Sequence, residues 1–230
     1  MLQQTQTQRV VEKYEAFIRH FPDFVSLDKA SLQEVLTQWQ GLGYNRRAIA
    51  LKKCAEVVIR EYRGRLPSSV DELIKLPGMG KATASSIRVF AFNKPAVFIE
   101  TNIRAVFIHF FFRESDRVSD ADILPLVEQT LDASNPREWY SALMDYGVML
   151  KKTFQNPARK SMHHKKQSRF EGSNRQLRGR ILKTLLIHPN IFEKDLVKKM
   201  GMDSDRLGEN LQRMEKEGLI QRERGRLSIA

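Results

Sequence analysis

The nine residues Leu76-Pro77-Gly78-Met79-Gly80-Lys81-Ala82-Thr83-Ala84 decide the fold of this chain. A helical pattern that begins near Val70 runs into this stretch, and a second one, Ala82 to Phe92, starts directly after its two glycines. Two helices joined by so short a turn form a hairpin, because glycine permits a positive φ and leaves the backbone open to a ligand. The N–H groups that begin the second helix, together with Lys81, favour a phosphate. The hairpin therefore predicts contact with a nucleic-acid backbone rather than with bases.

The glycine turn alone would also suit an ordinary helix C-cap. The longer string is more specific, with a hydrophobic residue and a proline before the glycines and a basic residue and Thr-Ala after them. It resembles the helix-hairpin-helix of the DNA glycosylase superfamily that includes endonuclease III and the adenine-specific mismatch glycosylases. The resemblance implies DNA contacts for Gly78, Met79, Gly80, Lys81 and Thr83.

A candidate catalytic acid follows the hairpin. Members of the family carry an aspartate there, and the corresponding stretch of this chain is Val97-Phe98-Ile99-Glu100-Thr101-Asn102-Ile103-Arg104-Ala105-Val106, with glutamate in its place. The resemblance implies that Glu100 stabilises the oxocarbenium-like sugar formed when an N-glycosidic bond breaks, and that Asn102 orients this acid. The extra methylene of Glu100 leaves a second interpretation open, in which the carboxylate only caps a helix of an inactive protein.

Two further stretches carry the same resemblance. Leu2-Gln3-Gln4-Thr5-Gln6 is similar to the first-helix motif of adenine glycosylases, so Gln3 and Gln4 are expected to enter the duplex, unless they form only a solvated helix end. Gly-Leu-Gly-Tyr-x-x-Arg-Ala, at residues 41–48, places Tyr44 near the extruded base. The alternative is a half-buried Tyr44 whose hydroxyl bonds a carbonyl. The family's upstream catalytic glutamate has no counterpart, so the chain either starts inside the natural gene product or lacks this acid.

The positive charge of the chain is concentrated in its last third. Residues 1–150 hold 19 Lys and Arg against 18 Asp and Glu, whereas residues 151–230 hold 20 against 9. Such an asymmetry favours a polyanionic partner, because it raises both the association rate and the sequence-independent affinity. Residues 151–174 are expected to form a basic linker that stays mobile until it meets DNA.

The residues after this linker resemble a winged helix-turn-helix. Helical patterns from Arg175 onward, at 192–200 and at 204–218 precede two short strands around Arg224-Gly225. In that fold the third helix and the wing contact DNA. The expected DNA-binding side chains are Arg206, Arg213, Arg222, Arg224 and Arg226. A protein-interaction domain of the same fold is the alternative.

No resident metal or cofactor is expected. Cys54 is the only cysteine, which rules out an internal disulfide. Many relatives bind an iron–sulfur cluster through four cysteines after the final core helix, but residues 151–157 supply none. The hairpin could hold a monovalent cation. Bifunctional relatives carry a Schiff-base lysine at the position of Ala82, and Lys81 points about 100° away from it, so strong β-lyase activity is not expected.

The remaining patterns predict an all-α protein. A helix at 1–20 should bury Val10, Tyr14, Phe17 and Ile18, and a second should run from Ser26 or Asp28 to Trp39. Further helices are expected at 48–62, 103–112, 120–131 and 136–150. The expected domains are a helix-hairpin-helix glycosylase core at 1–150, the linker at 151–174, and a small winged helix at 175–230.

The resemblance implies a monofunctional DNA glycosylase of base-excision repair that flips out and hydrolyses a mismatched base, in the first place adenine opposite guanine or oxidised guanine. A thymine or uracil mismatch glycosylase is one alternative, and a non-catalytic DNA-binding protein on the same scaffold is another. Double-stranded DNA is the expected partner. No apolar run reaches the length of a membrane span, so the expected state is a soluble cytoplasmic monomer, associated with the nucleoid if bacterial.

Overall fold

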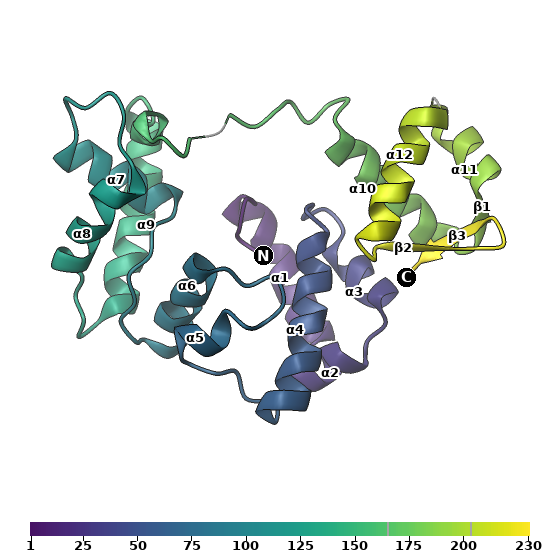
Figure 1. Cartoon of the computed structure of the whole chain (residues 1–230), viewed down its shortest axis with the longest axis horizontal. Coiled ribbons are helices and arrows are strands. Elements are labelled where there is room, and N and C mark those ends of the chain that lie inside the picture. Colours follow the sequence, from purple (N-terminus) through teal and green to yellow (C-terminus); the bar gives the residue numbers. More distant parts are fainter. Residues whose placement is uncertain (165, 203) are drawn as a thin grey trace. The chain divides into compact units, whose positions relative to one another are not determined.

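The computed structural model describes residues 1–164, 166–202 and 204–230. This part of the chain is mostly helical, with a small antiparallel sheet near the C-terminus (Figure 1), which confirms the predicted fold class. The chain forms two compact units. Unit 1 comprises Met1–Leu66 and Ser168–Ala230, and unit 2 comprises Pro67–Gln167. This grouping differs from the domain boundaries expected at residues 150 and 174, because the N-terminal helices and the C-terminal elements share one buried apolar cluster.

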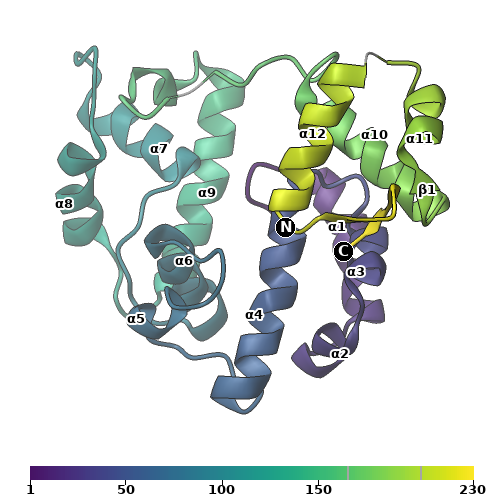
Figure 2. The same ribbon diagram turned by 45° about the vertical axis from the view of Figure 1, so that its right-hand side comes forward.

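Four helices begin unit 1 (Figure 2): α1 (Thr7–His20), α2 (Phe24–Lys29), α3 (Leu32–Trp39) and α4 (Arg46–Tyr62). The helix expected from residue 1 starts later, after Gln4, which adopts a positive φ of 57°. Its predicted buried face is half wrong, since Val10 and Phe17 are buried whereas Tyr14 and Ile18 are exposed. The residues before α1 therefore form a turn-rich loop.

The single helix expected up to Trp39 is in fact two helices, each with a capping box. The Asp23 carboxylate accepts the Ser26 N–H at 2.7 Å at the start of α2. At the start of α3 the Ser31 hydroxyl accepts the Glu34 N–H at 3.2 Å, and Glu34 accepts the Ser31 N–H at 2.7 Å. Such reciprocal bonds satisfy backbone donors that the first turn of a helix leaves unpaired.

The C-terminal part of unit 1 has the helices and the wing expected for a winged helix. Its helices are α10 (Asn174–Ile187), α11 (Glu193–Met200) and α12 (Ser204–Lys216), and its strands are β1 (Ile191–Phe192), β2 (Ile220–Glu223) and β3 (Arg226–Ile229). The strands pair antiparallel in the order β1-β3-β2. The predicted wing is the β2–β3 hairpin, in which Arg224 and Gly225 both adopt positive φ. Strand β1 was not expected, because a two-residue strand leaves no periodic pattern.

Unit 2 consists of α5 (Val70–Leu73), α6 (Lys81–Phe92), α7 (Thr101–Phe111), α8 (Asp120–Thr130), α9 (Pro136–Thr153) and the 3-10 helix η1 (Pro157–Lys160). Helix α7 packs against α9, α8 and η1, and Figures 1 and 2 both show α7 beside α9. The core between them is apolar and includes Phe98, Ile103, Phe107, Ile123 and Tyr140. The position of α7 in this core determines where its N-terminus lies.

Part of the segment expected to be a mobile linker is packed onto unit 2. Helix α9 continues through Thr153 instead of ending at Leu150, and η1 buries Pro157 and Ala158. Val118 then pairs with this segment, donating to Lys160 O at 3.0 Å and accepting from Met162 N at 2.9 Å. Buried residues and backbone pairing explain why a basic composition does not leave residues 151–162 unstructured.

Candidate active site and nucleic-acid interface

The hairpin forms at the predicted position in unit 2. Its first helix, α5, has only four residues, and Leu76 is buried beyond it. Gly78 adopts a φ of 71°, a conformation that suits glycine, and the extended Gly80 is the N-cap residue of α6. Within these described residues, no side chain caps α6 and no acid lies in its first turn. Its N-terminus is thus suited to an anion.

The exposure of the hairpin residues agrees with a contact surface. Gly78, Gly80 and Lys81 are exposed, whereas Met79 and Thr83 are half-buried. A Cβ at Gly80 would meet nothing within 4 Å in the protein itself, so the absence of a side chain there is not required by internal packing. Its absence does leave the backbone accessible to a large ligand.

The strand-like segment that leads to Glu100 is fixed by Tyr140 of α9. The Tyr140 hydroxyl donates to Ala96 O at 2.9 Å and accepts the Phe98 N–H at 3.3 Å, and the Phe98 and Tyr140 rings stack at 4.2 Å. Burial raises the pKa of Tyr140 to about 12, so this hydroxyl stays protonated over the physiological range. Tyr140 therefore fixes the backbone before Glu100 at Ala96 and at Phe98, on either side of Val97.

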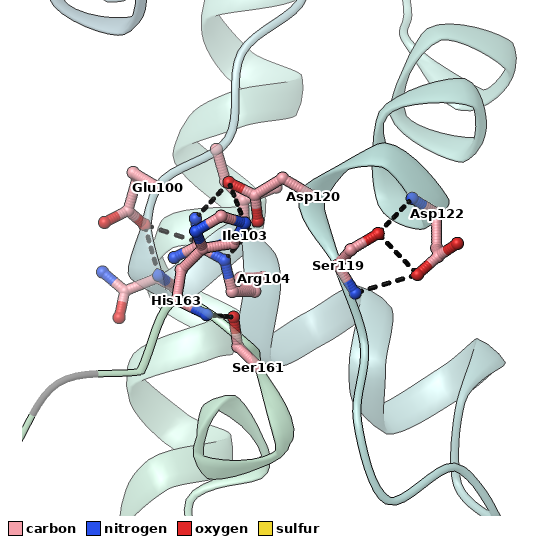
Figure 3. Close-up of polar contacts among 9 residues, drawn as sticks. Glu100, Ile103, Arg104, Ser119, Asp120, Asp122, Ser161 and His163 are labelled. Atoms are coloured by element: carbon pink, nitrogen blue, oxygen red, sulfur yellow. Dashed lines mark hydrogen bonds and ion pairs between the residues drawn. The ribbon is translucent and has the colours of Figure 1, made fainter.

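Glu100 is the N-cap residue of α7. Its Oε1 atom accepts the N–H groups of Asn102 at 2.5 Å and Ile103 at 3.2 Å (Figure 3), so one carboxylate oxygen makes both capping bonds. The side chain is half-buried. A negative charge at this helix end is stabilised by the helix dipole as well as by the two donors. The two capping bonds hold the Glu100 carboxylate in a defined position at the start of α7, the helix that follows the hairpin.

Asn102 lies between Glu100 and a lysine that sequence reasoning did not select. The Lys151 ammonium of α9 donates to Asn102 Oδ1 at 2.6 Å. Burial lowers the pKa of Lys151, the charge of Glu100 raises it, and Arg104 lowers it further. These influences require Lys151 to lie near both Glu100 and Arg104. Lys151 follows Gly147 by four residues, so both lie on one face of a helix that includes them. An expected helix that extended beyond Leu150 would have placed Lys151 on that face.

A glycine brings α9 close to the N-terminus of α7. A Cβ at Gly147 would lie 2.5 Å from Asn102 O and 2.7 Å from Asn102 Cβ. Contacts this short are not tolerated in packed interiors, so only glycine fits there. Gly147 lies in the helix expected at 136–150, but its role follows from the contact with Asn102.

A second ionic group lies on the other side of α7. The Arg104 guanidinium forms a forked ion pair with Asp120 of α8, with Nε at 2.7 Å from Oδ1 and Nη2 at 2.8 Å from Oδ2. His163 Nε2 lies 3.9 Å from the same carboxylate, and Figure 3 shows the three side chains together. None of them was predicted to interact, because their partners are distant in sequence.

The glutamines expected to enter the duplex lie in unit 1. Gln3 and Gln4 are exposed in the loop before α1, and not on the helix that the motif predicted. Arg47 holds this loop: its Nη1 donates to Met1 O at 2.7 Å and Gln3 O at 2.6 Å, and its Nη2 to Thr5 Oγ1 at 3.0 Å.

The same guanidinium holds the loop that precedes Tyr44. Nη2 of Arg47 also lies 3.2 Å from Leu42 O and 3.2 Å from Gly43 O. Tyr44 has a positive φ of 47°, and its hydroxyl accepts a hydrogen bond from the Arg175 guanidinium at 3.2 Å. Arg47 thus joins the two predicted DNA-contacting loops of unit 1, a role not assigned from sequence.

The five arginines expected to bind DNA in the winged helix differ in their surroundings. Arg222 is ion-paired with Glu193 and Glu215, and Arg213 lies 3.4 Å from Glu209.

Two more of these arginines contact other parts of the winged helix. Arg206 bonds Gly172 O and Asn174, and Arg226 lies 4.1 Å over the Phe192 ring. Arg224 is exposed at the tip of the wing.

The predicted site residues fall into both units. Glu100, Asn102 and the hairpin belong to unit 2, whereas Gln3, Gln4, Tyr44 and the five arginines belong to unit 1. The structure brings Glu100 and Asn102 into direct contact through the Asn102 backbone N–H, and Lys151 bonds the Asn102 side chain.

The residues present do not fit an iron–sulfur cluster. Cys54, the only thiol of the chain, is buried in α4, and burial raises its pKa to about 11. Iron–sulfur clusters need several thiolate ligands. Within the described ranges, no three His, Cys, Asp or Glu side chains gather as a metal site. None of the helices there has the length and apolar character that crossing a bilayer requires.

Comparison with known proteins matches residues 1–124 to the family described as HhH-GPD superfamily base excision DNA repair protein. The chain is 35% identical over 154 residues to an adenine DNA glycosylase of Buchnera aphidicola subsp. Baizongia pistaciae, which covers 65% of this chain and 43% of that protein. It is 31% identical over 202 residues to that of Mycolicibacterium smegmatis, covering 80% of this chain and 69% of the relative. A solved thermostable thymine-DNA glycosylase is similar with a TM-score of 0.59 and 25% identity, over 69% of this chain and 75% of that one.

The fold and the hairpin define a helix-hairpin-helix protein. Since the matched residues are more than half of the 230, the chain belongs to the HhH-GPD superfamily of base excision DNA repair proteins. It spans less than half the length of the Buchnera relative.

Proposed function

We propose that this chain is a monofunctional DNA glycosylase that hydrolyses the bond between a mismatched adenine and its deoxyribose. The observation that carries the proposal is the Glu100 carboxylate, which is fixed at the start of α7 through one of its two oxygens. The similarity to adenine DNA glycosylases supports adenine as the base, opposite guanine or oxidised guanine. We place the enzyme on double-stranded DNA as a monomer in the cytoplasm, at the nucleoid if it is bacterial.

Each part of the site has a role in this reaction. Phosphate oxygens of the DNA bind the N–H groups at the start of α6, with Lys81 adding charge. The base is extruded from the stack, and the bond from its nitrogen to C1′ breaks with both electrons leaving on the base. Glu100 stabilises the positive charge that develops on the sugar; a water oxygen then bonds C1′, the water gives up a proton, and the departing base takes up one. Asn102 orients Glu100, and Gln3, Gln4 and Tyr44 contact the opened duplex.

A thymine or uracil mismatch glycosylase is the second candidate, which the similarity to the thermostable thymine-DNA glycosylase favours. A non-catalytic DNA-binding protein is the third, since Glu100 already has a structural role as the cap of α7. The three candidates differ in which base is released, or in whether any is.

Single-turnover cleavage separates these candidates. The duplexes carry adenine opposite oxidised guanine, adenine opposite guanine, or thymine or uracil opposite guanine, and alkali reveals abasic sites. Wild type is compared with Glu100→Gln, because the amide keeps an oxygen for the α7 cap but loses the charge. We expect release of adenine by wild type and a loss of at least about 100-fold in Glu100→Gln. Equal rates in the two proteins would remove Glu100 from the mechanism, and binding without base release would favour the non-catalytic candidate.

The same duplexes test the absence of strong lyase activity. Ala82 and Lys81 are both exposed in the first turn of α6, and only Lys81 carries an amine. Borohydride added during cleavage should trap little covalent adduct. Efficient trapping through Lys81 would contradict the monofunctional reaction.

A further inference from the structure

Lys151 lies deeper in unit 2 than its position in a basic stretch suggests. It follows Gly147 by one helical turn on α9, and its side chain is half-buried, whereas the next residue, Lys152, is exposed. A buried ammonium is costly unless it has a partner. Its hydrogen bond to Asn102 Oδ1, at 2.6 Å, supplies that partner.

The surrounding geometry makes this contact specific. Gly147 lets α9 approach the Asn102 backbone so closely that a side chain could not fit between them. The backbone N–H of Asn102 donates to Glu100 Oε1. Its side-chain Nδ2 lies 3.8 Å from Met144 Sδ. The Asn102 side chain is therefore held between Lys151 on one side and the sulfur of Met144 on the other.

We propose that Lys151 is a positioning residue of the candidate active site, which fixes the Asn102 side chain beside Glu100. The inference rests on the proposed function, because it takes Glu100 and Asn102 as the groups that meet the substrate. Lys151 itself acts through Asn102.

Other basic side chains around α7 bond groups other than Asn102. Arg104, on α7 itself, is paired with Asp120 of α8, and His163 lies against the same carboxylate. On η1, Lys160 donates to Arg113 O, and Arg159 is exposed.

Loss of the Lys151 ammonium should release the Asn102 side chain from its position, so that the group beside Glu100 is less well ordered for the reaction.

The test compares wild type with Lys151→Met, Lys151→Arg and the matched control Lys152→Met. Single-turnover base release is measured from about pH 5 to about pH 9, and affinity is measured on a duplex with an uncleavable abasic analogue. Lys151→Met should slow release by about 10- to 100-fold, with little change in affinity. Lys151→Arg should restore most of the rate. Lys152→Met should weaken binding at most and leave the rate unchanged.

An NMR measurement separates this inference from the proposed function. The side-chain amide signals of Asn102 are assigned by their loss in Asn102→Asp and followed in the other variants. They should move in Lys151→Met and stay in place in Lys152→Met, whether or not any duplex is cleaved. Unchanged Asn102 signals in Lys151→Met would overturn the inference, as would a wild-type rate of base release in that variant. Failure of wild type to release any base would instead overturn the proposed function.

Discussion

Glu100 caps the helix that it begins with its own carboxylate. Its side chain turns back so that Oε1 reaches the N–H groups of Asn102 and Ile103, and the extra methylene is accommodated by this cap. Both interpretations that the sequence left open thus concern the same carboxylate. The cap holds the side chain in one position, which a catalytic carboxylate also needs.

Arg47 provides a prediction that distinguishes two adjacent arginines. Its guanidinium bonds the backbone of Met1, Gln3, Leu42 and Gly43, whereas the neighbouring Arg46 is exposed. Lysine keeps the charge but cannot make these forked bonds. Arg47→Lys should therefore lower the free energy of unfolding by about 1–3 kcal/mol, since it leaves carbonyl groups unpaired. It should also speed amide hydrogen exchange in residues 1–5 and 41–44.

Arg46→Lys is the control for this prediction, because it makes the same change of side chain at an exposed position. Urea unfolding and hydrogen-exchange mass spectrometry measure the two effects. If both variants behave alike, Arg47 does not hold the two loops.

A candidate site residue could be found from the sequence when its partner lies nearby in the chain, and was missed when the partner is distant. Glu100 and Asn102 were predictable because a short motif contains both of them. Lys151 was not, because it lies beyond the expected end of its helix and its partner is 49 residues away. Arg47 belonged to a quoted motif, yet its bonds to Met1 and Gln3 form only when the chain folds.

The helix starts of this protein repeat one local device. In α2, α3 and α8 a Ser or Asp N-cap bonds the third residue of the helix, which bonds back. The Ser-x-x-Glu and Ser-x-x-Asp patterns were readable in the sequence. They were missed before α3, where the expected helix ran through the interruption at Ala30. Local capping chemistry therefore decided an element boundary that hydrophobic periodicity did not detect.

These caps predict how stability depends on pH. Hydrogen bonds from Ser26, Ser31 and Ser119 hold the pKa values of Asp23, Glu34 and Asp122 below their usual range. Because the folded pKa is lower than the unfolded one, each contribution is present above the unfolded values of 3.8 for Asp and 4.5 for Glu. It is lost as the pH falls through the folded value.

Replacement of Ser119 by alanine tests this dependence. Ser119→Ala removes the hydroxyl that bonds Asp122, so the free energy of unfolding should fall less steeply as the pH decreases below about 5. Ser141→Ala is the control, since its hydroxyl bonds only a carbonyl of its own helix, Arg137 O. Urea unfolding at several pH values gives the slopes. Identical slopes in Ser119→Ala and wild type would contradict the assignment.

At the scale of the whole molecule, the buried apolar side chains of the described residues form two clusters, one in each unit. Ile123 is fully buried in unit 2, and Ile181 is fully buried in unit 1. The same small deletion, isoleucine to valine, can therefore be made in either core, at a typical cost of about 0.5–1.5 kcal/mol. Ile123→Val should raise hydrogen exchange in residues 67–164 alone, and Ile181→Val in residues 1–66 and 168–230 alone. Exchange that rises equally in both units in either variant would show that they unfold together.

The sequence did not predict that residues 1–66 and 168–230 form one compact unit. The step in charge at residue 150 indicated a boundary, but charge reports on partners and not on packing. Helices α3 and α10 join the same apolar cluster although more than a hundred residues separate them along the chain. Each pattern was readable by itself, whereas the pairing of distant apolar faces is fixed only in the folded protein.

Cys54 makes the unfolding of unit 1 measurable without any added label. The thiol is buried in α4, and its raised pKa keeps the reactive thiolate scarce at neutral pH. An alkylating reagent therefore modifies the native protein only through molecules in which α4 has opened. The rate of this single modification, read by mass spectrometry, reports how often that opening occurs. For the same reason, a second cysteine placed on the surface can be labelled selectively while Cys54 stays in the sequence.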